Sequence, residues 1–354
     1  MPIALLDRRA RCLVPLWLGV LLSGCASLDY YAQVSRGQLD LLVARQPVAD
    51  LLADPQTDPV LQRRLALAQQ AREFASAHLA LPDNRSYRLY ADLQRPYVVW
   101  NVFATPELSL APLTHCFPVA GCVAYRGFYQ QGRARGAAAL LQAEGMDTYV
   151  AGIEAYSTLG WFDDPILNTM LRWDDERLAA VIFHELAHQQ LYVADDTAFN
   201  ESFASFVEQE GLRQWRAARG LAPGDAHAER MRRQFTELIL ASRERLQALY
   251  GSPLDEAQKR AGKVAEFERL RGEYRTLRDG QWGGDRRYDA WVAQPLNNAR
   301  LLPFGLYDQW VDAFAALFRQ ASGDWAQFYR RAAALGELDA EQRERTLAAL
   351  ADQN

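Results

Sequence analysis

Two histidines and a glutamate have the spacing of a metal site in the run His184–His188, which reads His-Glu-Leu-Ala-His. Residues four apart face the same side of a helix, so both imidazoles can reach one metal ion. Glu185 is rotated by about 100° from His184, which lets it act on a water at the metal without being a ligand. The pattern predicts one Zn²⁺ ion held by His184 and His188, with Glu185 as the general base of a hydrolysis.

The segment that carries these side chains reads as a buried helix. It is apolar nearly all round from Leu178 to Leu191, and Asp174 or Asp175 can cap its start. Burying three ionisable groups in such a helix is costly unless something satisfies them. The alternative interpretation is two core histidines with hydrogen-bond partners and an unrelated salt bridge.

A catalytic zinc needs a third protein ligand, and Glu201 is the best candidate. A short polar break over residues 193–197 ends the helix, Thr197 can cap the next one, and Glu201 then lies in its first turn or just beyond. A tight helical hairpin would bring Glu201 close to His188. Residue 194 is alanine, which excludes the class with a third histidine six residues past the second. Glu201 as a solvated carboxylate stays open, and the substitute ligands are Asp195, Asp196 and Glu208.

The composition predicts one compact unit around this site. The chain has 354 residues, of which 49% are hydrophobic and 23% are charged, and these values fit neither disorder nor a membrane-spanning bundle. The net charge of -5 comes without any basic run, so nucleic acid is a poor candidate partner.

The N-terminus reads as an export signal. Three arginines, Arg8, Arg9 and Arg11, precede a short apolar stretch, and residues 22–25 (Leu-Ser-Gly-Cys) resemble the lipobox of bacterial lipoproteins. We expect cleavage of a signal peptide over residues 1–24 and lipidation of Cys25, which anchors residues 25–354 to a membrane. Ala26 favours the outer membrane of a Gram-negative cell, facing the periplasm. An ordinary signal peptide with a chance cysteine is the alternative.

Cys116 and Cys122 are the remaining cysteines of the mature chain apart from the anchor. In an oxidising periplasm, two cysteines this close can form a disulfide, and Pro118 and Gly121 favour the bend that the loop needs. A metal clamp made by the two cysteines is the alternative, but no second Cys/His pair accompanies them.

The coarse pattern predicts an α+β protein with a helical majority. Helices are expected over residues 30–45 and 59–78 in an N-terminal region, 25–85. Strands rich in aromatic and β-branched residues follow within 86–215, with one over 148–156, before the two zinc-site helices. A helical region, 216–354, completes the chain. Trp161 and Phe162 are expected to belong to the core.

The two helices together resemble the gluzincin metallopeptidases. Residues 199–203 (Phe-Asn-Glu-Ser-Phe), followed by Ala204, are similar to the Asn-Glu-Gly-Phe-Ala segment of the large zinc aminopeptidases. The resemblance implies a zincin-like catalytic core, with a small sheet and a zinc-binding helical hairpin, in which Glu201 is the third ligand. Only twelve residues separate His188 from Glu201, fewer than in those enzymes.

A wider resemblance covers most of the mature chain. Residues 31–45, 116–128, 155–162 and 297–299 are similar to a family of bacterial lipoproteins that is usually labelled putative aminopeptidases. The resemblance implies an aminopeptidase that acts on peptides in the cell envelope. Two rival functions stay open: a zinc endopeptidase or cell-wall peptide hydrolase with the same site, and a non-catalytic envelope lipoprotein with structural zinc.

Peptide hydrolysis requires further groups. The developing oxyanion needs a donor, for which we expect Tyr307, with Tyr288 and His227 as alternatives. Gluzincins pair substrate with an edge strand before the zinc helix, which places Glu154 and Tyr156 in the substrate site. By the same resemblance Glu154 binds the free amine of the substrate.

Overall fold

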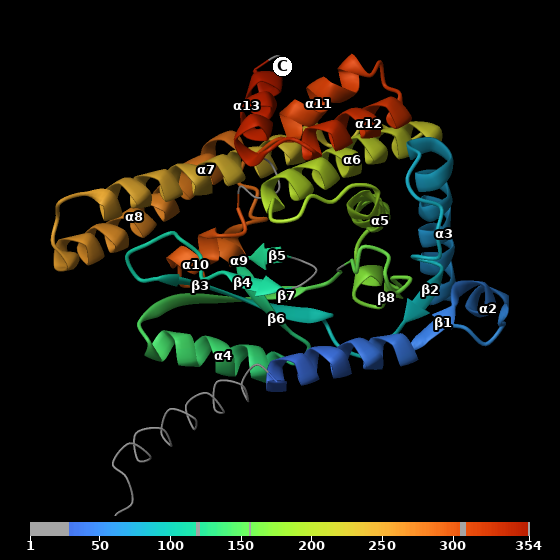
Figure 1. The fold of residues 1–354 in the computed structure, drawn as a ribbon, viewed down its shortest axis with the longest axis horizontal. Helices are drawn as coiled ribbons and strands as arrows, with labels where there is room; N and C mark the ends of the chain where they lie inside the picture. Colours follow the sequence, from blue (N-terminus) through green and yellow to red (C-terminus); the bar gives the residue numbers. More distant parts are fainter. Residues whose placement is uncertain (1–27, 118–120, 156, 305–308, 353–354) are drawn as a thin grey trace, which may run out of the picture.

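Helices form most of the protein, and three small sheets lie beside them (Figure 1). The computed structural model describes residues 28–117, 121–155, 157–304 and 309–352. The prediction of an α+β protein with a helical majority is confirmed. No helix in these ranges is long and apolar enough to cross a membrane.

The first half of the chain builds the sheets and their covering helices. A helix over residues 28–43 comes first, without a label in Figure 1. The elements that follow are β1 Arg45–Pro47, α2 Val48–Ala53, α3 Pro59–Leu79, β2 Leu89–Ala91, β3 Val99–Pro106, β4 His115–Phe117, β5 Gly121–Val123, β6 Tyr125–Phe128, α4 Gln131–Ala143, β7 Met146–Ile153 and β8 Ile166–Leu167.

The second half is helical. A 3₁₀ turn, η1 Met170–Arg172, leads into α5 Asp175–Gln190, α6 Thr197–Ala218, α7 Ala226–Gly251 and α8 Glu256–Thr276. A π-helical turn, η2 Leu277–Gln281, is followed by α9 Asp289–Val292, α10 Asn298–Leu301, α11 Val311–Gln320, α12 Trp325–Gly336 and α13 Ala340–Ala351.

The sheet nearest the functional residues has the strand order β6-β3-β7, and both pairings are antiparallel. Successive side chains of a strand point to opposite faces. Trp100 and Val102 of β3 therefore pack towards α4, whereas Phe103 packs towards α10. Figure 1 shows α4 on one side of this sheet and α10 on the other. Strand β7 is at the edge, and no described strand pairs with its outer side.

The main hydrophobic core lies between α3, α5, α6, α11 and α12. Its largest buried side chains include aromatic residues from four of these helices: Phe183, Phe203, Phe314 and Phe328. Burial of each such ring stabilises the fold by about 1.5–3 kcal/mol relative to exposure. Helix α5 is enclosed by this packing, as its continuous apolar sequence predicts.

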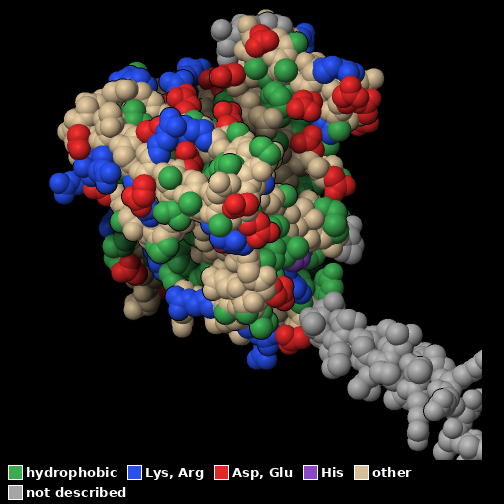
Figure 2. Space-filling model, turned by 90° about the vertical axis from the view of Figure 1, so that its left-hand side faces the viewer, with side chains coloured by type: hydrophobic (Ala, Val, Ile, Leu, Met, Phe, Trp, Pro, Cys, Tyr) green, Lys and Arg blue, Asp and Glu red, His purple; other side chains and the backbone are tan. Residues whose placement is uncertain are grey.

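A separate core joins α7 and α8, which extend to one end of the molecule (Figure 1). Phe235, Phe267, Tyr274 and Trp282 are buried there. Figure 2 views the molecule from this end and shows lysine and arginine side chains interspersed with acidic ones. This face carries no extended basic patch.

The strand expected over residues 148–156 is present as β7, which begins earlier, at Met146, and ends earlier, at Ile153. A second local expectation was wrong. Trp161 and Phe162 were expected in the core, but they are 72% and 48% exposed. The loop that carries them is organised by the buried carboxylate of Asp164, which accepts bonds from Ser157, Thr158 and Gly160. These inward bonds leave the two aromatic side chains on the outside of the turn.

Candidate metal centre

Helix α5 fixes the first two candidate ligands. It begins after Asp174, whose side chain accepts the N–H of Arg177 at 2.8 Å. Ile182, Phe183 and Leu186 are fully buried around it, which holds the helix against the main core. His184, Glu185 and His188 are buried in the same helix. The sequence predicted this enclosed placement from the apolar residues on every side.

A short loop, residues 191–196, connects α5 to α6 and brings the next carboxylate into place. Asp196, and not Thr197 as expected, caps α6 by accepting the N–H of Phe199 at 3.0 Å. The buried side chain of Asn200 binds the backbone of Val193 twice, accepting from its N–H at 2.8 Å and donating to its carbonyl at 2.7 Å. Because Glu201 follows Asn200 directly, this clamp fixes the position of Glu201 relative to the end of α5.

His184, His188 and Glu201 present three ligand atoms to one point. His184 Nε2 lies 3.2 Å from His188 Nε2. Glu201 Oε2 lies 3.3 Å from His184 Nε2 and 3.7 Å from His188 Nε2. Ligand atoms at about 2.0–2.1 Å from a tetrahedral zinc lie about 3.3–3.4 Å apart, which matches these separations. Within the described part of the chain, this is the one group of three such side chains that suits a metal ion.

Glu208 orients one of the imidazoles. Its Oε2 lies 3.0 Å from His184 Nδ1, so Nδ1–H donates to the carboxylate and leaves the lone pair of Nε2 available to a metal. A carboxylate on the second ring nitrogen is the usual support for a metal-binding histidine. Glu208 was a substitute ligand in the sequence interpretation; here it contacts the far side of His184 instead.

The electrostatics at this point favour a positive charge between the three side chains. Glu201 Oε2 is buried and makes no well-aligned hydrogen bond. Burial raises the pKa of Glu201, but the imidazoles of His188 and His184 outweigh burial and hold that pKa far below its usual value. Burial lowers the pKa of His184, but Glu201 and Glu208 outweigh it, and the pKa stays well above the usual value. A divalent cation would satisfy all three ligand atoms at once, and two imidazoles with one carboxylate form a donor set typical of zinc.

Glu185 is free for a different task. Its carboxylate is buried, and it makes neither a hydrogen bond nor an ion pair with the described residues. Burial raises the pKa of Glu185, opposed by the nearby His184 and His188. A buried carboxylate without a structural partner, beside three metal-ligand atoms, has the properties of a general base.

Tyr125 of β6 is a site residue that the sequence interpretation missed. Burial raises the pKa of its phenol to about 12, and the nearby charges of Glu201 and Glu185 contribute to the increase. Its hydroxyl makes no hydrogen bond with the described residues, so it is available as a donor. The available signal was its position within residues 116–128, one of the segments that carried the family resemblance.

Glu154 lies immediately beyond β7 and is half-buried. Its Oε2 accepts the indole N–H of Trp173 at 2.7 Å, and its backbone carbonyl accepts the hydroxyl of Thr169. No cationic side chain among the described residues forms an ion pair with it.

Several other candidates lie away from the metal ligands. Asp196 caps α6 and binds Arg343 at 2.8 Å. Tyr288 stacks on Phe235, with ring centroids 3.9 Å apart, in the α7–α8 core. His227 is exposed at the start of α7. The structure thus brings none of these three into the group formed by α5 and α6. Three other predicted residues lie outside the described ranges: Cys25, Tyr156 and Tyr307.

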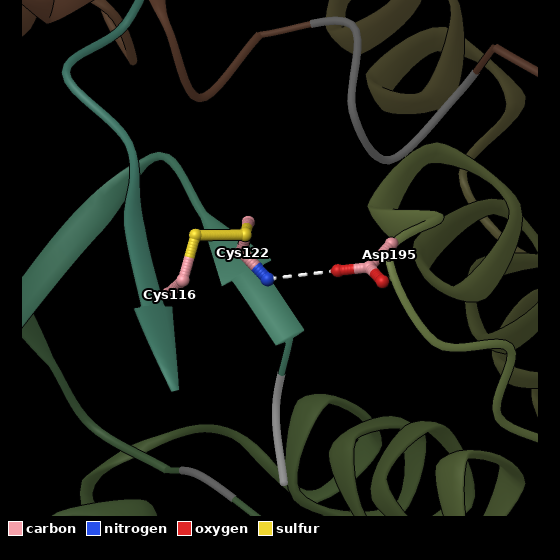
Figure 3. Close-up of a disulfide and its surroundings, with 3 residues drawn as sticks. All are labelled: Cys116, Cys122 and Asp195. Atoms are coloured by element: carbon pink, nitrogen blue, oxygen red, sulfur yellow. Dashed lines mark hydrogen bonds between the residues drawn. A yellow bond between two sulfur atoms is a disulfide. The ribbon is translucent and has the colours of Figure 1, made fainter. Parts of the chain in front are cut away.

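A disulfide joins Cys116 and Cys122 across the β4–β5 hairpin, beside the loop between α5 and α6 (Figure 3). Asp195 of that loop accepts the backbone N–H of Cys122 at 2.9 Å. Gly121 adopts a φ of +70°, and a Cβ there would collide with the Asp195 carboxylate. Asp195 therefore serves the contact between the hairpin and the loop, and is not part of the metal-ligand group.

Comparison with known proteins identifies one family. Residues 29–347 match the model of one protein family, described as "Putative aminopeptidase". No curated protein and no solved structure matches the chain. The match covers the sheet, the α5–α6 hairpin and most of the C-terminal helices. The chain therefore belongs to this aminopeptidase family, which is described as "Putative aminopeptidase".

Proposed function

We propose that the protein is a zinc-dependent aminopeptidase of the gluzincin type, with a zincin-like catalytic core. The observation that carries this proposal is the approach of His184 Nε2, His188 Nε2 and Glu201 Oε2 to within 3.2–3.7 Å of one another. Family membership supports peptides as the substrate class. The metal is proposed from the donor set and its spacing.

In this proposal, His184, His188 and Glu201 hold one Zn²⁺ ion, and Glu208 keeps His184 in the correct tautomer. When bound there, zinc supplies a Lewis acid that polarises the scissile carbonyl and acidifies water. Glu185 accepts a proton from the attacking water and delivers it to the nitrogen of the leaving amine. Burial raises the pKa of Glu185, which strengthens it as a proton acceptor for the first of these steps.

Two groups of the sheet complete the proposed site. The Tyr125 hydroxyl is the donor that we propose for the developing oxyanion, in place of Tyr288 and His227. The open edge of β7 can pair with an extended peptide backbone, as exposed sheet edges do. Glu154 at the end of β7 would bind the α-ammonium group of that peptide, because its charge has no cationic partner in the described structure.

The proposed location is the cell envelope. The basic residues before the apolar stretch, and the Leu-Ser-Gly-Cys run that ends at Cys25, support export and lipid attachment. The mass of the N-terminal peptide of the protein purified from membranes would reveal acylation of Cys25. An unmodified peptide that includes residues 1–24 would exclude the anchor.

Glu185→Gln in the zinc-loaded protein is the direct test of function. The amide keeps the size of the side chain but cannot accept the proton, so we expect kcat to fall by about 10²- to 10⁴-fold. Zinc content, measured by atomic emission, should stay equal to that of the wild type. Glu237→Gln is the matched control, because Glu237 is an exposed carboxylate on α7.

The same assay separates the rival functions. An aminopeptidase requires a free amine, so acetylating the N-terminus of a peptide substrate should abolish cleavage. Cleavage of acetylated peptides at an equal rate would indicate an endopeptidase. If wild type and Glu185→Gln are both inactive on all peptides and both bind one zinc, the metal has a structural role and the proposed activity is wrong.

A further inference from the structure

A cavity of about 400 Å³ lies against the open edge of β7. Its walls come from three places: Arg135 and Gln142 on α4, Thr148 and Val150 on β7, and Asn297 and Arg300 at α10. The cavity therefore lies between α4 and α10, beside the outer edge of β7.

Arg300 brings an unbalanced positive charge to this cavity. Three arginines are buried in the described part of the chain: Arg72, Arg300 and Arg343. Arg72 lies 3.5 Å from the carboxylate of Asp83, and Arg343 binds Asp196 at 2.8 Å. Arg300 is 5% exposed and has no described carboxylate within ion-pair distance.

The contacts of Arg300 leave part of the guanidinium unsatisfied. Its two terminal nitrogens donate to neutral groups, the side chain of Gln294 at 2.7 Å and the carbonyl of Trp291 at 3.0 Å. Its Nε is buried and has no hydrogen-bond partner. The guanidinium also lies 5.3 Å from the Tyr149 ring centroid. A buried cation with an unused donor, lining a cavity, is suited to an anionic ligand.

The backbone of β7 shows where a peptide could pair with this edge. Ile153 turns its carbonyl towards the neighbouring strand segment and accepts the N–H of Val98 at 2.8 Å. Thr148 turns its carbonyl outward, where it accepts the side-chain N–H of Asn297 at 2.9 Å. In an antiparallel ladder the direction alternates along the strand, so Val150 and Gly152 also direct their polar groups outward. Asn297 occupies the edge at Thr148, so pairing ends beside the cavity.

The edge of β7 thus has an opposite charge at each end. Glu154, without a cationic partner, lies at the C-terminal end of the strand, and Arg300, without an anionic partner, lines the cavity near Thr148. An extended peptide antiparallel to β7 would have its amine at Glu154 and its C-terminal end at the cavity. Thr148 precedes Glu154 by six positions, about 20 Å of strand, which corresponds to a peptide of about four to six residues.

We propose that the cavity formed by Arg300, Arg135 and Asn297 binds a carboxylate of the substrate, so that the enzyme selects short peptides with a free C-terminus. The inference rests on the proposed aminopeptidase function and names its substrate class. The carboxylate can be that of the C-terminus or of an acidic side chain at the same position, since both have the same chemistry.

The test compares matched pentapeptides on the zinc-loaded mature protein, one with a free C-terminal carboxylate and one with a C-terminal amide. A charge-assisted hydrogen bond to a guanidinium should make kcat/KM about 10- to 100-fold higher for the carboxylate. The ratio of the two kcat/KM values should fall to near one in Arg300→Gln and should also decrease in Arg135→Gln. Because Arg135 is exposed, misfolding would not explain a decrease in the second variant. Arg133→Gln on the same helix, where Arg133 pairs with Asp29 at the surface, should keep the wild-type ratio.

Two further peptides identify the source of the carboxylate. An amidated pentapeptide with glutamate as its last residue recovers the high kcat/KM only if a side-chain carboxylate can enter the cavity. A free-acid peptide of ten residues should lose the advantage over its amide, because its terminus extends beyond Thr148. A wild-type ratio near one for the pentapeptides, or a ratio that Arg300→Gln and Arg135→Gln both leave unchanged, would overturn the proposal.

A binding experiment keeps this inference separate from the proposed function. Calorimetry on Glu185→Gln measures the affinity for the free-acid and the amidated pentapeptide without turnover, and the affinity should differ about 10- to 100-fold. If the protein binds the free-acid peptide more tightly but the wild type hydrolyses neither peptide, the proposed aminopeptidase activity is wrong and carboxylate binding in the cavity still holds. If the wild type hydrolyses peptides but the affinity for the two pentapeptides is equal, carboxylate binding in the cavity is wrong and the aminopeptidase activity still holds.

Discussion

The metal-ligand group and the β7 cavity each contain a buried polar atom without a hydrogen-bond partner, a carboxylate oxygen in the first and a guanidinium nitrogen in the second. At the first, buried Glu201 Oε2 has no well-aligned hydrogen bond and lies between two imidazole nitrogens. At the second, buried Arg300 has an unused donor and no carboxylate. We propose that the first position binds a cation and that the second binds an anion.

The difference lies in how firmly each position is built. The ligands of the first come from two long helices packed in the main core, joined by the Asn200 clamp. The second lies at the open edge of a small sheet, where α10 has only four residues. A resident ion requires fixed ligands, whereas a substrate must enter and leave. A row of rings, Tyr125, Phe103 and Tyr149, lies between the two positions, with centroids 5.4 and 6.1 Å apart.

Removing one ligand should have the largest effect. In His188→Ala, two remaining ligands cannot hold zinc, so we expect the zinc content to fall from about one ion per chain to near zero. Activity should decrease by roughly 10³-fold or more, because the Lewis acid is lost. Atomic emission and peptide turnover measure both. A chelator should lower the Tm of the wild type but not that of the variant. His78→Ala, an exposed histidine on α3, should behave as wild type, and a fully metallated His188→Ala would contradict the assignment.

Tyr125→Phe should have the next largest effect. The substitution removes only the hydroxyl, so kcat should decrease by about 10²-fold while KM changes little, as for the loss of one oxyanion donor. Steady-state kinetics with the amidated pentapeptide measure this change, because that peptide has no C-terminal carboxylate to bind in the cavity. Tyr31→Phe, at an exposed position of the first helix, is the control. An unchanged kcat would show that Tyr125 is not the oxyanion donor and that its ring only packs against Phe103.

The smallest expected effect concerns stability. Arg72→Met removes the donor to three backbone carbonyls, those of Pro82, Asn84 and Ser86, and should lower the free energy of unfolding by about 3 kcal/mol. Arg300→Met removes two hydrogen bonds but also an uncompensated buried charge, so its cost should be about 1 kcal/mol or less. Urea denaturation at a constant m value measures both. Equal losses would show that Arg300 is a structural element of the fold like Arg72.

The metal-ligand group was the most predictable part of the molecule. His184, Glu185 and His188 follow from helical spacing, and the apolar residues on every side of them in the sequence are enough to indicate burial. The prediction of Glu201 required a turn of defined length, which the short break over residues 193–197 indicated. The capping residue was misplaced by one position, because both Asp196 and Thr197 are good caps and only the loop geometry selects between them.

The sheet side of the site could not be predicted in the same way. Tyr125 reaches Glu201 and Glu185 only through the pairing of β6 with β3, and register over such a separation has no local signal. The cavity depends on Asn297 and Arg300, which lie roughly 150 residues after β7 in the sequence. The exposure of Trp161 and Phe162 depends on the bonds of Asp164, whereas their type alone suggested a core position.

The disulfide next to the α5–α6 loop determines whether the two cysteines can act as metal ligands. Reduced cysteines bind zinc and copper more strongly than carboxylates do, and two of them lie on a hairpin that contacts the loop through Asp195. Once Cys116 and Cys122 are oxidised to each other, neither can offer a thiolate. In the proposed metal site, the covalent bond would thereby keep the two sulfur atoms from competing with the imidazoles and Glu201 for the ion.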